Sequence, residues 1–156
     1  MVKKVILDCD PGHDDALALL MAIASKNIDL LAVTTSAGNQ LPEKTYLNAK
    51  RLLTLAKCDD IPVAKGANKP LRRELIIADD VHGASGIDGA ELPESTIQDL
   101  DISANDLIAK ILRESEEKIT LIATGPLTNI AIFLLSHPEL KEKIELISFM
   151  GGACFG

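Results

Sequence analysis

Short apolar runs alternate along this chain with segments of helical periodicity, and this alternation constrains the fold more than any other feature. Five runs have the length and the turn-bounded ends of buried strands, at residues 5–7, 30–35, 61–64, 119–123 and 144–149. Helix-forming apolar residues predict a helix at 16–24, and helical spacing predicts helices at 42–57, from Ser103 onward and at 127–135. The first of these is an unbroken apolar run, so we expect it to be buried. Strands that alternate with helices pair in parallel, and the sequence therefore predicts an α/β fold with a mostly parallel sheet flanked by helices.

Two segments depart from the alternation. Residues 66–101 contain glycines at intervals of three, two prolines and many acids, which predicts a long surface loop. The chain then ends on a glycine-rich stretch, 150–156, where a doubly wound sheet requires a covering helix. We therefore expect a sheet that is truncated after its fifth strand and leaves one face of that strand bare.

Composition excludes several classes of function. A chain of 156 residues that is 47% hydrophobic can bury one sizeable core. A net charge of -7, only 3% aromatic residues and no Trp argue against a nucleic-acid partner. No apolar run approaches the length of a membrane span, and the first residues do not form a signal segment. The three cysteines are widely spaced and form no CxxC, which predicts reduced thiols and a cytoplasmic location.

Four carboxylates follow the first predicted strand within eight residues: Asp8, Asp10, Asp14 and Asp15. Such a group repels itself unless a cation or protons neutralise it, and carboxylate oxygens are the ligands that hard divalent ions select. The alternative is that the last two acids only cap a helix and complement its dipole. That alternative leaves the first two unexplained, so the cluster favours a metal site.

Ligands of open parallel sheets bind beyond the carboxyl ends of the strands, so the other residues at those ends are candidates. Asn39 and Thr124 follow the second and fourth predicted strands, and His82 lies in the long loop. On sequence grounds Asn39 is equally well a turn residue, and His82 equally well faces solvent. Cys9 has no nearby base and is expected to be a buried, inert thiol. Motifs of phosphate loops, nucleophile elbows and zinc proteases are not present in the sequence.

Taken together, the motifs resemble one known family. They are DCDPGHDDA at 8–16, AVTT at 32–35 followed by Gly38-Asn39, His82-Gly83, TGPLTNIA at 124–131 and MGG at 150–152. The chain resembles inosine-uridine preferring nucleoside hydrolases over its whole length, in what looks like their N-terminal half. The resemblance implies a Rossmann-like α/β fold and calcium-dependent hydrolysis of the N-glycosidic bond of ribonucleosides to free base and ribose, a reaction of purine and pyrimidine salvage.

The resemblance also implies a role for each candidate residue. Asp10, Asp15 and the backbone carbonyl of Thr124 would ligate Ca²⁺, and Asp10 would also act as the general base. Asp14 and Asn39 would hydrogen-bond the ribose hydroxyls. His82 would lie on the nucleobase side of the pocket. Asp8 would support the metal site from behind without binding the ion. His13 is assigned no role.

Family members have further calcium and ribose ligands in a half that the sequence does not contain. Residues 1–156 would be the N-terminal part of a single α/β nucleoside hydrolase-like domain, with the C-terminal part absent. This half offers about four oxygen ligands where calcium takes six to eight, so we expect weak calcium binding and little or no turnover. An inactive remnant of a hydrolase is the alternative. A phosphatase of the haloacid dehalogenase type fits poorly, because Pro-Gly follows the DxD. A homo-oligomer is left open.

Overall fold

The computed structural model describes residues 2–152 and 154, which form a five-stranded, entirely parallel sheet with the order β3-β2-β1-β4-β5. All five predicted strands are present, and the predicted α/β fold is confirmed. In register, Asp8 lies between Thr34 of one neighbouring strand and Ala123 of the other. The strands are β1 (Lys3–Cys9), β2 (Ile28–Thr35), β3 (Val63–Lys65), β4 (Ile119–Ala123) and β5 (Ile144–Phe149).

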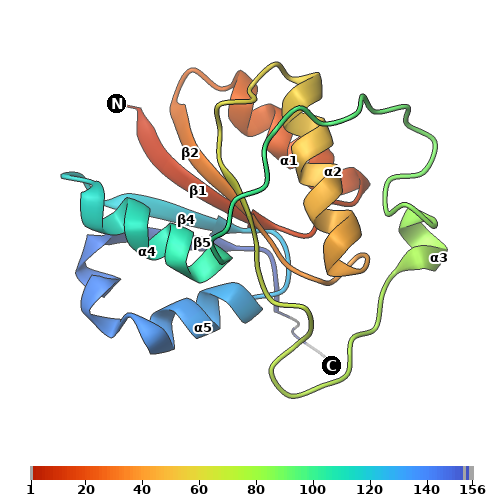
Figure 1. The fold of residues 1–156 in the computed structure, drawn as a ribbon. Coiled ribbons are helices and arrows are strands. Elements are labelled where there is room, and N and C mark those ends of the chain that lie inside the picture. Colours follow the sequence, from red (N-terminus) through yellow and green to blue (C-terminus); the bar gives the residue numbers. More distant parts are fainter. Residues whose placement is uncertain (1, 153, 155–156) are drawn as a thin grey trace.

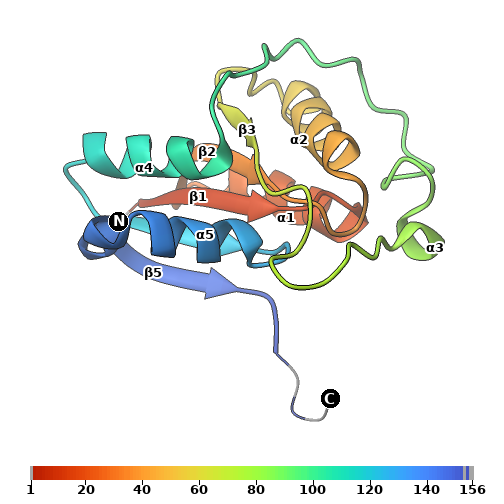
Figure 2. The ribbon, with the colours of Figure 1, turned by 60° about the horizontal axis from the view of Figure 1, so that its bottom comes forward.

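Helices cover both faces of this sheet (Figures 1 and 2). The core beneath α1 and α2 and the core beneath α4 and α5 are separate clusters of buried side chains, divided by the sheet. The helices are α1 (His13–Ala24), α2 (Pro42–Leu55), α3 (Asp79–His82), α4 (Ala104–Glu114) and α5 (Thr128–Ser136), with a 3₁₀ turn η1 (Pro138–Lys143) before β5. The predicted Ser103 cap of α4 is confirmed, because its hydroxyl accepts a hydrogen bond from the Asp106 N–H at 3.2 Å.

The burial of the central strand, β1, on both of its faces explains its unbroken apolar run. Val5 and Leu7 of β1 pack into the cluster under α1 and α2, while Ile6 packs into the cluster on the opposite face. A strand that is buried on both faces is apolar without alternation. The sequence order reverses at this strand, because the chain proceeds outward through β2 and β3 and then returns to β4 on the other side. In such sheets the crevice for a ligand lies at the carboxyl ends of the two strands that flank the reversal, here β1 and β4.

The structure corrects the prediction of a buried helix at 16–24. One side of α1 faces solvent, with Leu17 65% and Met21 72% exposed, while Leu19 is fully buried. An apolar run without periodicity does not indicate which side meets the core, and this explains the error.

The predicted surface loop at 66–101 is also more structured than expected. It contains the single turn of α3 and places Ile87 and Ile97 in the core, so parts of it pack against the body of the protein. At the far edge of the sheet, Leu146 and Phe149 of β5 are each 56% exposed, in agreement with the predicted bare strand.

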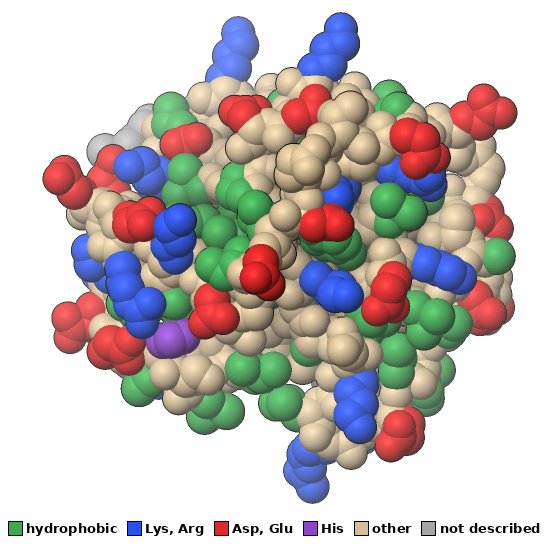
Figure 3. Space-filling model, viewed as in Figure 1, with side chains coloured by type: hydrophobic (Ala, Val, Ile, Leu, Met, Phe, Trp, Pro, Cys, Tyr) green, Lys and Arg blue, Asp and Glu red, His purple; other side chains and the backbone are tan. Residues whose placement is uncertain are grey.

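The charged surface is mixed. Figure 3 shows acidic and basic side chains interspersed over the viewed face, with apolar side chains between them. Within the described residues, no helix combines the length and the apolar character that crossing a membrane requires.

Candidate active site

The acidic motif forms the connection between β1 and α1. β1 ends at Cys9, residues 10–12 turn the chain, and α1 begins at His13 with two acids in its first turn. The turn is tightly enclosed, since a Cβ on Gly12 would lie 2.7 Å from the His82 ring and 2.8 Å from the Asn39 amide nitrogen. A residue without a side chain is therefore required where the loops from three parts of the chain meet.

Asp10 is buried, and the segment after β2 holds its carboxylate. Its Oδ2 accepts a hydrogen bond from the Asn39 backbone N–H at 2.7 Å, and its carbonyl accepts one from the Asn39 side-chain amide at 3.1 Å. Two glycines make room for this carboxylate. A Cβ on Gly38 would overlap Oδ2, and a Cβ on Gly125 would lie 2.7 Å from Oδ1. Neither glycine can gain a side chain without displacing Asp10.

Asn39 joins the two buried acids. Besides its contact with the Asp10 carbonyl, its Nδ2 donates to Asp15 Oδ2 at 3.2 Å, and the Gly12 N–H donates to the same oxygen at 3.4 Å. Only the amide nitrogen of the Asn39 side chain serves in these contacts, so its oxygen is left to accept a hydrogen bond from a ligand hydroxyl. Asn39 is therefore more than a turn residue.

Burial disfavours the charged form of these acids and raises their pKa values. The pKa of Asp10 rises first because of burial and second because of the nearby charge of Asp15. Burial also raises the pKa of Asp15, and the charge of Asp14 contributes in the same direction. A bound divalent cation would oppose these shifts, because its charge stabilises ionised carboxylates.

Asp8 lies beneath the turn, and two side chains that the sequence did not single out hold it. Its Oδ2 accepts hydrogen bonds from the Thr34 hydroxyl at 2.5 Å and from the Asn129 amide at 2.8 Å. Burial raises the pKa of Asp8 to about 6, although both hydrogen bonds oppose the shift. Asn129 is itself fully buried and also bonds the Thr35 carbonyl and the Ala67 N–H. Asp8 and Asn129 thus fasten the ends of β1, β2 and β3 to α5.

A cleft of about 360 Å³ opens at the carboxyl edge of the sheet, over the crevice between β1 and β4. It brings together four of the seven predicted site residues, while Asp8, Asp15 and His82 do not line it. No motif marks two of its residues, Ile76 and Ala78, and Met150, which begins the MGG motif, had been given no role. The lining consists of Asp10, Asp14, Gly38, Asn39, Ile76, Ala78, Thr124, Gly125, Pro126 and Met150.

His82 lies at the end of α3 and packs beside the acidic turn. Its ring stacks on His13 with centroids 5.4 Å apart, and the two Nδ1 atoms are 3.2 Å apart. His13, which the sequence left without a role, therefore connects His82 to the first turn of α1. Its Nε2 also bonds the Asp88 carbonyl at 2.9 Å.

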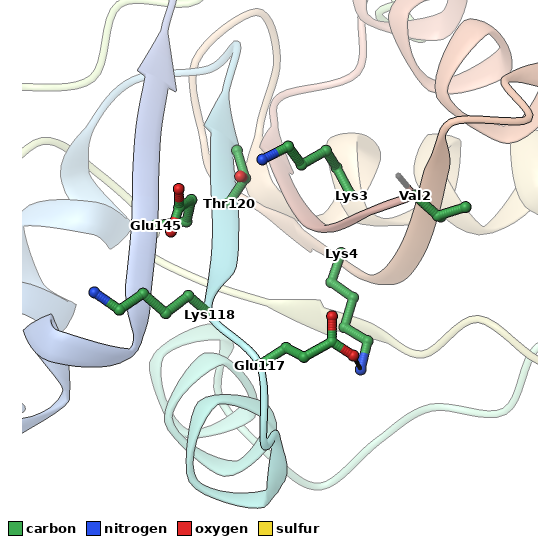
Figure 4. Close-up of a pocket in the computed structure, with 7 residues that line it drawn as sticks. All are labelled: Val2, Lys3, Lys4, Glu117, Lys118, Thr120 and Glu145. Atoms are coloured by element: carbon green, nitrogen blue, oxygen red, sulfur yellow. Dashed lines mark ion pairs between the residues drawn. The ribbon is translucent and has the colours of Figure 1, made fainter.

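A second cleft, of about 260 Å³, lies at the opposite edge of the sheet (Figure 4). Lysines and glutamates at the starts of β1, β4 and β5 line it, and Lys4 and Glu117 form an ion pair at 2.8 Å. Because ligands of parallel sheets bind at the carboxyl ends of the strands, the chemistry belongs to the cleft around Asp10.

The oxygens around the acidic turn fit a hard cation in part. Within the described part of the chain, Asp8 Oδ1, Asp15 Oδ1 and the Thr124 hydroxyl are buried and have no hydrogen-bond partner. Buried polar atoms are rarely left unpaired, and a bound ion or water relieves their cost. However, residues 2–152 and 154 contain no group of three or more His, Cys, Asp or Glu side chains arranged to hold a metal ion. Asp10, Asp15 and the oxygens of Thr124 would therefore supply only part of the ligand set that such a cation takes.

Comparisons with known proteins agree with this architecture. The chain is 59% identical over 153 residues to a pyrimidine-specific ribonucleoside hydrolase RihA of Salmonella arizonae. Among solved structures, it matches a purine-preferring ribonucleoside hydrolase of Gardnerella vaginalis with a TM-score of 0.90 at 35% identity, over 97% of this chain and 49% of that one. A plant nucleoside hydrolase, PpNRh1, gives a TM-score of 0.89 at 39% identity, over 98% of this chain and 49% of that one.

The match to the Salmonella enzyme covers 98% of this chain and 49% of the relative, so the chain spans about half the length of the curated relatives it matches. The sequence model of inosine-uridine preferring nucleoside hydrolases matches residues 5–156. This match includes the acidic turn, the segment after β2 and the residues after β4, which together supply most of the residues that line the cleft. The chain therefore belongs to the inosine-uridine preferring nucleoside hydrolase family.

Proposed function

We propose that this chain carries the calcium- and ribose-binding part of an enzyme that hydrolyses the N-glycosidic bond of ribonucleosides to free base and ribose. One observation carries the proposal: Asp10, Asp14, Asn39 and Thr124 surround a single cleft at the point where the strand order reverses. The names of the relatives support a ribonucleoside as the substrate. Both pyrimidine-specific and purine-preferring enzymes occur among them, so both kinds of nucleoside are to be tested.

We assign calcium to Asp10, Asp15 and the carbonyl of Thr124, because calcium takes many oxygen ligands in flexible geometry. When bound, the ion would lower the pKa of a water molecule and hold the two hydroxyls of the sugar diol. The buried, unpartnered Oδ1 of Asp15 supports this assignment. Asp8 supports the site from below through its contacts with Thr34 and Asn129.

The chain's own residues provide the other requirements of glycosidic hydrolysis. Such a reaction passes through an oxocarbenium-like state and needs a base to activate water at the anomeric carbon. Asp10 lines the cleft and is placed to accept that proton. Asp14, exposed at the cleft, and the free amide oxygen of Asn39 accept hydrogen bonds from ribose hydroxyls and so fix the sugar. We assign His82, which lies beside the acidic turn, to the nucleobase side.

We further propose that residues 1–156 are the N-terminal part of one α/β hydrolase domain, in line with their coverage of about half of each relative. The partial ligand set supports the expectation of weak calcium binding and little turnover by this chain alone. The three free cysteines support a cytoplasmic location. A homo-oligomer stays a prediction that sedimentation of the purified chain tests.

Titration of uridine and inosine into the purified chain tests the function. We expect saturable binding that calcium strengthens and that a chelator weakens, because the ion and Asp14 hold the same diol. Asp14→Ala is expected to lose the nucleoside while it keeps calcium. Nucleoside binding that is equal with calcium and with chelator would contradict the proposal, and calcium-independent phosphate release from phosphate esters would favour the phosphatase alternative.

Gly125→Ala is expected to weaken calcium binding about tenfold or more while the protein stays folded, as happens when support around a metal ligand is lost. The added methyl group meets Asp10 Oδ1 at 2.7 Å and pushes the carboxylate aside. Gly151→Ala is the matched control, since a Cβ there meets only the Phe149 ring at 3.5 Å. Calorimetry on both variants checks this, and equal calcium affinity in the two would show that Asp10 does not bind the ion.

A further inference from the structure

Three polar side chains hold the segment that follows α3. Gln40, Lys44 and Asn48 recur at intervals of four residues, just before and within α2, which is the spacing of one helix face. All three donate to backbone carbonyls of residues 83–85. The bonds run from Gln40 to Gly83 and Ala84, each at 3.3 Å, from Lys44 to Ala84, and from Asn48 to Ser85 at 3.0 Å.

Asn48 has a second partner in the acidic turn. It is 3% exposed, and its Nδ2 also donates to the Pro11 carbonyl at 3.2 Å. One buried amide therefore joins the residue next to Asp10 to the segment next to His82. The approach is close, because a Cβ on Gly86, at a φ of +85°, would lie 3.2 Å from the Asn48 amide nitrogen.

Hydrogen bonds within residues 82–88 close this segment on itself and fix His82. The Asp88 carboxylate accepts hydrogen bonds from the backbone N–H groups of Ala84 and Ser85, each at 2.9 Å. The Asp88 N–H returns to the His82 carbonyl at 3.2 Å. With residues 83–85 bound on α2 and Asp88 closing the unit, the His82 ring is directed onto His13 and over Gly12.

We propose that Gln40, Lys44 and Asn48 are positioning residues, which fix His82 relative to the acidic turn and thereby set where a nucleobase meets the chain. They act through residues 83–85. The consequence for the nucleobase rests on the proposed function, whereas the positioning of His82 is a property of the free protein.

The test compares Asn48→Ala with Thr45→Val. Thr45 is a fully buried neighbour on α2 whose hydroxyl bonds the Ser36 carbonyl at 2.9 Å, so its loss removes a buried hydrogen bond without touching residues 83–85. Nuclear magnetic resonance then follows two local signals: amide exchange of Gly86 and Asp88, and the Overhauser contact between the His13 and His82 rings.

In Asn48→Ala we expect exchange at these two amides to accelerate about tenfold or more and the ring contact to weaken, because the segment opens locally. Thr45→Val is expected to leave both signals unchanged. Unchanged signals in Asn48→Ala, or equal changes in the two variants, would overturn the proposal.

Lys44→Met covers the case in which Asn48→Ala does not fold, since Lys44 is only half-buried. It is expected to accelerate the same amide exchange to a smaller degree, and no acceleration would overturn the proposal. Calcium titration of the unaltered chain separates this result from the proposed function. A chain that binds no calcium refutes the metal assignment and leaves the exchange measurements to decide the positioning of His82.

Discussion

Asn129→Ala is expected to lower the free energy of unfolding by about 3 kcal/mol, because it breaks a fully buried hydrogen-bond network. The Asn129 amide bonds the Asp8 carboxylate, the Thr35 carbonyl and the Ala67 N–H. Without it, each of these groups at the junction of β1, β2 and the segment after β3 loses a partner, and those of Asp8 and Thr35 stay buried. Urea unfolding followed by circular dichroism measures the change.

Asn105→Ala is the matched control for that measurement. Asn105 lies in the first turn of α4, and its side-chain oxygen has no hydrogen-bond partner within the described residues. Its replacement is expected to change the free energy of unfolding by about 0.5 kcal/mol or less. Similar losses in the two variants would show that the Asn129 network does not stabilise the fold beyond ordinary packing.

Asp10→Ala is expected to reduce calcium affinity by about a hundredfold or more, since it removes a charged ligand from a set that is already partial. It also removes an acid whose pKa is raised by burial and by the nearby charge of Asp15, so the variant is expected to fold as well as the unaltered chain. Asp14→Ala serves as the control, because Asp14 is exposed and is assigned to ribose rather than to calcium. Calorimetry on the three proteins distinguishes these roles, and a variant at Asp10 that binds calcium normally would refute the metal assignment.

The sequence predicted the strands and the cleft because both depend on local patterns. Strands such as β1 are buried on both faces, so their apolar runs are visible without tertiary information. The residues after each strand end then meet at one edge, which is why Asp10, Asn39 and Thr124 were found together.

Contacts between distant residues explain what the sequence did not predict. Asp8 and Asn129 are separated by 121 positions, and no periodicity records that their side chains are bonded. The role of His13 likewise depends on His82, 69 positions away. The single turn of α3 is too short to show helical spacing, and the exposed side of α1 is indistinguishable from its buried side because both are apolar.

Calcium titration of the unaltered chain, with and without ribose, tests the central claim most directly. We expect weak, saturable binding at one site that ribose strengthens, because the ion and the side chains of Asp14 and Asn39 would hold the same sugar. A folded chain that binds no calcium under either condition would contradict the claim that Asp10, Asp15 and Thr124 form a metal site.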